Sequence, residues 1–358
     1  MLNINLEAAT EALSTVHDPD LHKDLITLNM ARNIEILSGN KVKFNLVLTT
    51  PACPLKAKIE EDCREALLKA GASEVEIETT AEVRGFRGLP GKQAIPGIAH
   101  IVAVSSGKGG VGKSTVSVNL AVSLAKLGAK VGLLDADITG PNIPLMLGIK
   151  EKPSTTTDGK KILPLEGHGI KVISMGLLLA DDEPVVWRGP MLHNAISQFF
   201  RDVAWGDLDY LIVDLPPGTS DAQLTIAQSV PLSGVVIVST PQEVALLDSK
   251  KGLMMFRQMG VNIIGLVENM SYFIAPDTGV HYAIFGSGGA KLVAENLGIE
   301  CLGQIPLQIA VREGGDNGKP ICSSDPEGEV AQVFAQIAQR VAAQISILNA
   351  HQPELSAL

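Results

Sequence analysis

Short apolar runs recur along the chain after residue 97, and segments with helical spacing separate most of them. Six runs rich in Val and Ile have the length of strands, and they span residues 101–105, 131–135, 172–174, 211–214, 235–239 and 263–269. Strands that are apolar along their whole length and alternate with helices are typical of a parallel sheet with both faces covered. The pattern predicts an α/β fold with a mostly parallel sheet and helices on both of its faces.

The first 80 residues follow a different pattern. The elements expected there, in order, are a helix over residues 3–16, strands over 30–37 and 42–48, a helix over 55–70 and a strand over 75–79. Apolar positions recur every three or four residues in the helices and every second residue in the last strand. This order predicts a small α+β domain in front of the sheet domain.

Glycine and proline interrupt the stretch between the two patterns. Six of the fourteen residues from 84 to 97 are Gly or Pro, which breaks any regular element. We therefore expect a domain over residues 1–83, a linker over 84–97, the sheet domain over 98–350 and a short tail over 351–358. The last helix of the sheet domain should pack on its core through Val330, Val333, Phe334, Ile337, Val341 and Ile345.

Composition and charge narrow the possible function classes. The chain has 358 residues, a formal net charge of −10 and 4% aromatic residues. An acidic balance argues against binding of nucleic acid through a broad basic face, and few aromatic residues argue against base stacking on single strands. No apolar run reaches the roughly 18 residues that span a bilayer. We expect neither a nucleic-acid partner nor a membrane partner.

Cysteine usage and the first residues of the chain bear on its compartment. Four cysteines in a chain of this length do not make a disulfide scaffold. The first residues lack the basic and apolar stretches of a secretory signal. We expect a cytoplasmic protein.

A glycine-rich loop follows the first strand of the sheet domain. It reads Gly107, Lys108, Gly109, Gly110, Val111, Gly112, Lys113, Ser114 and Thr115, and a helix is expected directly after it, over residues 116–127. Strand, loop and helix in this order are the context of a phosphate-binding P-loop, where backbone N–H groups and the helix dipole hold phosphate oxygens. Lys113 is expected at the β- and γ-phosphates, and Ser114 at Mg²⁺.

Acidic residues follow two further strands. Asp135 and Asp137 come at the end of one, and Asp214 ends another, four residues before Gly218. Because ligands bind at the carboxyl ends of strands in such sheets, these groups should point at the phosphates. Asp214 and Asp135 are the candidates for the Mg²⁺ shell, Asp137 for positioning the attacking water, and Gly218 for a backbone N–H to the γ-phosphate. These parts are sufficient for slow hydrolysis.

The sequence gives less evidence on which nucleotide base is bound. The chain has no Asn-Lys-x-Asp loop of the kind that reads guanine. Asn269, at the end of the strand over residues 263–269, is the candidate for hydrogen bonds to adenine, although an Asn there could equally be a turn former.

Lys108 distinguishes this loop from an ordinary P-loop. The run from Lys108 to Ser114 resembles the deviant P-loop of the MinD/ParA class of ATPases. In that class the first lysine reaches the nucleotide of the partner subunit, which implies a role for Lys108 in catalysis beside Lys113 and Asp137.

Nearly the whole chain resembles the Mrp/ApbC branch of that class, the iron–sulfur cluster carriers. The resemblance rests on residues 105–115, 135–141, 187–191, 214–221, 268–273, 285–289 and 305–320. The first domain resembles the MIP18/DUF59 domain through residues 17–20 (His-Asp-Pro-Asp) and 50–54 (Thr-Pro-Ala-Cys-Pro). The resemblance implies a homodimer that hydrolyses ATP, holds a [4Fe–4S] cluster and delivers it to apoprotein recipients.

One motif of that branch is missing. The family follows Glu-Asn-Met-Ser-x-Phe with a Cys-x-x-Cys pair, and here Ala275 and Thr278 stand at those positions. Neither side chain replaces a thiolate, because cluster iron prefers soft sulfur ligands. The usual bridging site is therefore absent from this sequence.

Among the four cysteines, Cys53 is the candidate iron–sulfur ligand. It lies at the expected start of a helix, with Pro54 at the first helical position, and a helix N-terminus lowers the pKa of a thiol. The alternative is an ordinary small capping residue. Cys63 and Cys301 are expected in the core. Cys322 is expected in a loop, where it could be open to solvent. Cys301 and Cys322 stay possible cluster ligands.

Three functions compete. A cluster-carrying ATPase agrees best with the fused first domain. A metal-free positioning or partner-binding switch of the MinD/ParA kind agrees with the missing Cys-x-x-Cys, but the chain has no basic tail that would bind a membrane. An electron-transferring reductase would need the bridging cluster, so it fits least well.

Overall fold

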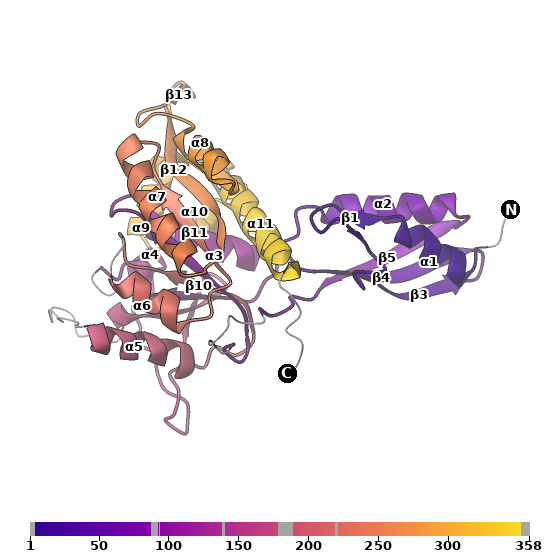
Figure 1. Ribbon diagram of the computed structural model, residues 1–358, viewed down its shortest axis with the longest axis horizontal. Coiled ribbons are helices and arrows are strands. Elements are labelled where there is room, and N and C mark those ends of the chain that lie inside the picture. The colour runs from indigo at the N-terminus through magenta and orange to yellow at the C-terminus, as the bar shows by residue number, and fades with distance from the viewer. Residues whose placement is uncertain are drawn as a thin grey trace. The chain divides into compact units, whose positions relative to one another are not determined.

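The computed structural model describes residues 4–86, 92, 94–137, 140–177, 189–218 and 221–351. It divides into two compact units, one of residues 1–84 with 342–358 and one of residues 85–341 (Figure 1). The predictions for Trp187, Arg188 and Thr219, for much of the linker and for nearly all of the tail lie outside the described residues.

The smaller unit has the predicted order of main elements. These are α1 (Leu6–Ser14), β3 (Ala31–Leu37), β4 (Lys41–Leu48), α2 (Lys56–Lys69) and β5 (Glu74–Ala81), with an unpredicted pair of two-residue strands, β1 (His17–Asp18) and β2 (Lys23–Asp24), after α1. β4 lies in the middle of its sheet, antiparallel to β3 and parallel to β5.

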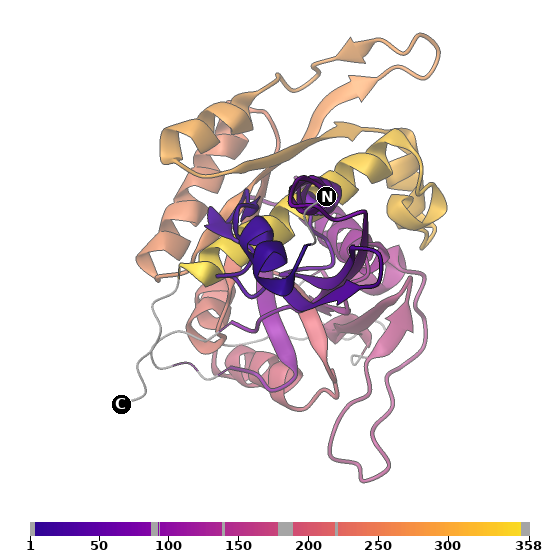
Figure 2. The ribbon, with the colours of Figure 1, turned by 90° about the vertical axis from the view of Figure 1, so that its right-hand side faces the viewer.

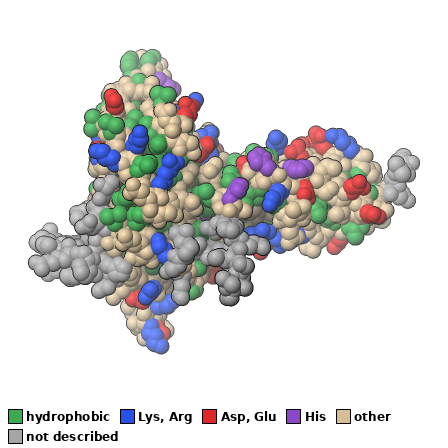
Figure 3. All heavy atoms as spheres, viewed as in Figure 1, with side chains coloured by type: hydrophobic (Ala, Val, Ile, Leu, Met, Phe, Trp, Pro, Cys, Tyr) green, Lys and Arg blue, Asp and Glu red, His purple; other side chains and the backbone are tan. Residues whose placement is uncertain are grey.

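Alternation along β4 decides which face of this sheet is covered. Val42, Phe44, Leu46 and Leu48 are at most 2% exposed and pack in one cluster with apolar residues of α1 and α2. The intervening Lys41 and Lys43 form ion pairs with glutamates of β5. Because alternate side chains of a strand point to opposite faces, these ion pairs make the other sheet face a charged, solvated one. Figure 3 shows charged side chains of both signs over the visible surface of this unit.

The larger unit is built on a nine-stranded sheet in the order β13-β12-β11-β6-β10-β7-β9-β8, with β14 also paired to β12. Its parallel strands are β6 (Ile98–Ser106), β7 (Val131–Asp135), β9 (Ile170–Ser174), β10 (Leu208–Asp214), β11 (Gly234–Ser239), β12 (Ile263–Ile274) and β14 (Cys301–Leu307). The short β8 (Leu165–Gly167) and β13 (His281–Tyr282) are antiparallel to their neighbours. The predicted mostly parallel sheet is confirmed.

Helices cover both faces of this sheet (Figures 1 and 2). On one face pack α5 (Gly189–Arg201), α6 (Asp221–Ser229), α7 (Glu243–Gln258) and α8 (Gly289–Leu297). On the other lie α3 (Lys113–Lys126), α10 (Ile321–Ser324) and the part of α11 (Glu329–Ala350) that precedes residue 342. α4 (Ile143–Met146) and α9 (Ile309–Asp316) lie side by side, and a short 3₁₀ turn spans Met175–Leu177. In the described part of the chain, no helix is both long enough and apolar enough to span a bilayer.

Two local predictions are wrong. The strand predicted over residues 263–269 runs on to Ile274, so Asn269 lies inside β12 and not at its end. Met270 has a left-handed backbone (φ 55°), and the register between β12 and β14 shifts there. The strand is therefore irregular at the position where the sequence predicts its end. Cys322, expected in a loop and open to solvent, lies in α10 and is 2% exposed.

Candidate nucleotide-binding site

The glycine-rich loop joins β6 to α3 at the carboxyl edge of the sheet. Gly110 (φ 81°) and Gly112 (φ 82°) both have left-handed backbone, and Gly112 caps the start of α3. Only glycine adopts this conformation without steric cost, and the turn aims the first N–H groups of α3 outward. The loop therefore has the form that binds phosphate.

Three side chains of α3 converge on Asp214 at the end of β10. Lys113 Nζ and Ser114 Oγ each lie 2.7 Å from Asp214 Oδ2, and Ser117 Oγ lies 2.5 Å from Asp214 Oδ1. Lys113 Nζ also lies 3.8 Å from Asp137 Oδ2. Strand β6 leads directly into the loop and pairs with β10, which is why residues a hundred positions apart meet here.

Asp135 is buried beside this cluster. It is paired in register with Asp214 on the neighbouring strand, and its Oδ2 accepts a hydrogen bond from Ser174 Oγ at 2.8 Å. Burial, and then the negative charge of Asp214, raises the pKa of Asp135 to about 7. This carboxyl group is therefore poised to exchange a proton, or to be ionised by a cation, near neutral pH.

A cavity of about 480 Å³ opens above the loop. It is lined by most of the predicted residues and by a second set that was not predicted to bind the nucleotide. These are Asn142, Leu145, Met146, Pro306, Leu307, Gln308, Val311 and Arg312. The second set comes from α4, the end of β14 and α9. A larger cavity, of about 900 Å³, lies at the opposite end of the strands and contains none of the predicted groups.

Two predicted ligand groups have protein partners in the structure. Asn269 Nδ2 donates to the carbonyl of Val111 at 2.8 Å, so this amide braces the P-loop while also lining the cavity. The Gly218 N–H donates to the carbonyl of Ser106 at 2.9 Å. The single N–H of Gly218 must give up its bond to Ser106 to bind a phosphate, whereas the Asn269 amide has a second N–H that can donate to a base while the first stays on Val111.

The donor set at the loop fits Mg²⁺. Ser114, Asp214 and Asp135 offer a hydroxyl and carboxylate oxygens, the hard ligands that Mg²⁺ prefers, and phosphates and waters normally complete its shell. The described residues include no group of three or more His, Cys, Asp or Glu side chains that would hold a metal ion on their own. The oxygen ligands at the loop therefore suit Mg²⁺ bound together with the phosphates of a nucleotide.

Two polar networks at the site were missed from the sequence. Ser117 follows Ser114 by one helical turn, and this spacing is a signal that could have found it. Glu268 is fully buried and accepts hydrogen bonds from Ser271, from Gln304 and from the Ala290 N–H at the start of α8. Its partners are up to 36 positions away, so no local pattern marks it.

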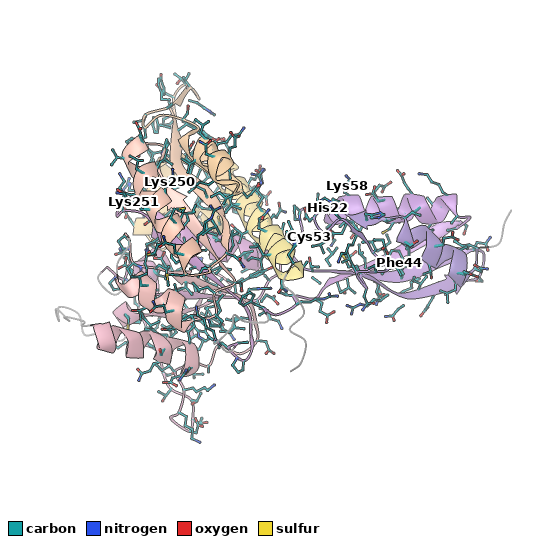
Figure 4. All side chains as sticks on the ribbon, viewed as in Figure 1. His22, Phe44, Cys53, Lys58, Lys250 and Lys251 are labelled. Carbon is teal, nitrogen blue, oxygen red and sulfur yellow. The ribbon has the colours of Figure 1, made fainter. Side chains whose placement is uncertain are left out.

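The cysteines lie in different surroundings. Cys53 is half-buried near the start of α2, where Figure 4 also places His22 and Lys58. Burial raises the pKa of Cys53 to about 11, and nearby Asp18 and Asp20 add to this, while backbone hydrogen bonds from Leu55 and Lys56 act against it. The predicted lowering of its pKa is therefore wrong. Moreover, α2 begins at Lys56, so Pro54 is not its first residue.

The other three thiols are also partly or fully shielded from solvent. Cys63 is fully buried in the core, as predicted, and Cys322 is buried against Ser123. Cys301, expected in the core, is half-buried at the start of β14, and burial raises its pKa as well. The β12–β13 hairpin carries Ala275 and Thr278 where the resembling family has cysteines, so it offers no thiolate.

Comparison with known proteins identifies the family. Residues 97–342 match the ParA model, described as NUBPL iron-transfer P-loop NTPase, over more than half of the chain. The chain belongs to this family. Residues 6–79 match a second model, described as iron–sulfur cluster assembly protein. The predicted resemblance is thereby confirmed.

Several similar proteins are named iron–sulfur cluster carrier protein. The iron–sulfur cluster carrier protein of Synechocystis sp. is 52% identical over 349 residues, which cover 96% of this chain and 99% of the relative. The carrier protein of Escherichia coli is 43% identical over 334 residues, covering 93% and 90%.

Solved structures agree on the fold. A nucleotide-binding protein of Archaeoglobus fulgidus, solved in complex with ADP, is 40% identical and covers 67% of this chain and 93% of its own, with a TM-score of 0.59. The MinD cell division ATPase of Pyrococcus furiosus, 24% identical with a TM-score of 0.51, covers 68% and 98% and supports the fold alone.

Proposed function

We propose that this protein is an ATP-hydrolysing carrier that accepts an iron–sulfur cluster as cargo and passes it to apoproteins. The observation that carries the proposal is a P-loop site, with Lys113 and Ser114 on Asp214, in a chain that belongs to the iron-transfer NTPases. The match of residues 6–79 to an iron–sulfur assembly domain supports the cargo. Relatives 43–52% identical over nearly the whole chain are named as carriers.

In this proposal, nucleotide binding replaces hydrogen bonds within the P-loop site by bonds to the nucleotide. Lys113 and Ser114 bond to Asp214 in the structure, and the phosphates of ATP offer Lys113 a better acceptor. Ser114, with Asp214 and Asp135 in support, would hold Mg²⁺, which would supply neutralisation of the phosphate charge. Asp137 lines the cavity beside Lys113 and orients the attacking water.

Gly218 supplies the switch in this proposal. Its backbone is left-handed (φ 83°) and its N–H donates to the Ser106 carbonyl. To bind a γ-phosphate, this N–H has to turn away from Ser106, which moves the segment after β10. The difference between ATP and ADP is thus converted into a backbone movement at the carboxyl edge of the sheet.

The cargo site involves Cys53 in this proposal. Its raised pKa means that Cys53 is a neutral thiol at pH 7, so cluster binding has to release its proton. The N–H groups of Leu55 and Lys56 then stabilise the thiolate. A homodimer brings two such thiolates, and the half-buried Cys301 is the second candidate ligand.

A homodimer is supported by apolar side chains left in solvent. The residues concerned lie on α7, on β13 and the segments on either side of it, and on α8. They are Val244, Leu247, Val280, Tyr282, Ile284 and Leu292, each at least 47% exposed. Hydrophobic side chains are visible in Figure 3 at the end of the larger unit that carries β13 and α8. Exposed apolar groups of this kind mark protein interfaces. A cytoplasmic location and the choice of ATP over other nucleotides stay predictions of the sequence.

Anaerobic reconstitution tests the proposal. The full chain is incubated with iron and sulfide, bound iron is counted, absorption is recorded, and transfer to an apo-ferredoxin is followed with and without ATP. We expect a cluster in the wild type that is lost in Cys53→Ser and kept in the buried control Cys322→Ser. Lys113→Ala should keep the cluster and lose ATP hydrolysis, because the charge at the phosphates is gone.

The outcomes separate the competing functions. A cluster that survives in Cys53→Ser moves the cargo site to Cys301. Hydrolysis of ATP without a cluster under any condition would overturn the carrier proposal in favour of a metal-free partner-binding switch.

A further inference from the structure

Ser117 has no place among the nucleotide-binding groups, yet it makes the shortest contact to Asp214. Its hydroxyl lies 2.5 Å from Asp214 Oδ1 and 3.1 Å from the Lys113 carbonyl. A hydroxyl has one proton to donate, and the charged acceptor at the shorter distance takes it. Both residues are buried, Ser117 completely and Asp214 to 1% exposure, so water does not compete for this bond.

The two oxygens of Asp214 are used differently. Oδ2 accepts from Lys113 and Ser114, which both line the cavity. Oδ1 accepts from Ser117, which does not line it. In the proposed function, on which this inference rests, Lys113 turns to phosphate and Ser114 to Mg²⁺. Ser117 is then the one partner of the three that keeps its bond to Asp214.

We infer that Ser117 is a positioning residue that holds Asp214 with Oδ2 toward the cavity while Mg-nucleotide is bound. Without the Ser117 hydroxyl, no donor among the described residues holds Oδ1 once Lys113 and Ser114 have turned away, and the Asp214 carboxylate can rotate so that Oδ2 leaves the cavity side. Asp214 then serves Mg²⁺ poorly, whereas contacts of the P-loop backbone with the phosphates are unaffected. The loss should therefore appear only in the part of nucleotide affinity that depends on Mg²⁺.

The test compares nucleotide binding with and without the cation. Binding of ADP to the full-length protein is measured by titration calorimetry in excess Mg²⁺ and in EDTA, and the ratio of the two dissociation constants is the readout. We expect Ser117→Ala to lower this ratio by roughly tenfold, the size expected for one hydrogen bond to a charged group. The dissociation constant in EDTA should stay close to that of the wild type.

Ser123→Ala is the matched control, because Ser123 is a buried serine of the same helix that donates to Cys322 instead. Ser117→Cys keeps the size of the side chain with a weaker donor and should give an intermediate ratio, which keeps the test available if the alanine variant does not fold. Binding of Mn²⁺ with ADP, followed by electron paramagnetic resonance, should weaken in the same order.

An unchanged ratio in Ser117→Ala, or an equal fall in Ser123→Ala, would overturn this inference and leave the proposed function standing. A wild-type protein that binds no ADP, with or without Mg²⁺, would overturn both.

Discussion

Among single residues, Asp135 shows how burial changes a carboxyl group. Its pKa of about 7 compares with 3.8 for an unperturbed aspartate. Between these two values the folded protein holds a proton that the unfolded chain has released. The contribution of Asp135 to the free energy of unfolding is therefore present at low pH and falls as the pH rises from about 4 to about 7.

We predict that Asp135→Asn removes this pH dependence. The wild type should lose up to about 1.4 kcal/mol of stability per pH unit across the window, relative to the variant. Urea denaturation at several pH values, in EDTA and without nucleotide, measures the slope. Asp277→Asn, at an exposed hairpin position, is the control and should keep the wild-type slope. Parallel slopes for the wild type and Asp135→Asn would contradict the assignment.

At the scale of elements, the P-loop is specified by backbone shape as well as by side chains. Gly112 is left-handed, and a Cβ added there would lie 2.2 Å from Asn269 Nδ2. The same amide donates to the carbonyl of Val111, so loop and strand β12 hold each other in place. The turn into α3 therefore depends on a strand 158 residues further along the chain.

Gly112→Ala should destabilise the protein even without nucleotide. Left-handed backbone costs a residue with a Cβ about 1–3 kcal/mol, and displacement of the Asn269 amide adds to this. Gly109→Ala is the matched control, because Gly109 lies in the same loop with open space around it, and it should change stability by under about 0.5 kcal/mol. Chemical denaturation compares the two, and equal free energies of unfolding would count against a strained loop.

For the whole molecule, the proposed dimer gives Lys108 its role. Lys108 lies in the P-loop and lines the cavity. Its carbonyl accepts a hydrogen bond from Ser106 Oγ, but its side chain has no hydrogen-bond or ion-pair partner among the described residues. In the proposed dimer its charge approaches the nucleotide of the other subunit.

We predict that ATP and Mg²⁺ raise the mass in light scattering from 37.7 kDa toward twice that value. Lys108→Ala should lower the dimer fraction and slow hydrolysis at least tenfold, because it removes a charge from the bound phosphates. Lys160→Ala is the control, because the Lys160 side chain is 81% exposed and does not line the cavity. A wild type that stays monomeric in ATP would contradict the dimer.

The sequence by itself determined the fold class, the P-loop and the family. Apolar strands that alternate with helices imply a parallel sheet, and the carboxyl ends of its strands meet at one edge. Asp135 and Asp214 could therefore be expected near Lys113 without any structure. These inferences succeed because they depend on patterns within a few residues and on a topology with few alternatives.

Only the tertiary structure decided the surroundings of individual groups. The bond of Ser117 to Asp214, the brace from Asn269 to the P-loop and the burial of Glu268 join residues from separate elements. The raised pKa of Cys53 and the burial of Cys322 reverse what their neighbours in sequence indicate. Desolvation depends on everything that packs around a side chain, and local sequence does not contain that information.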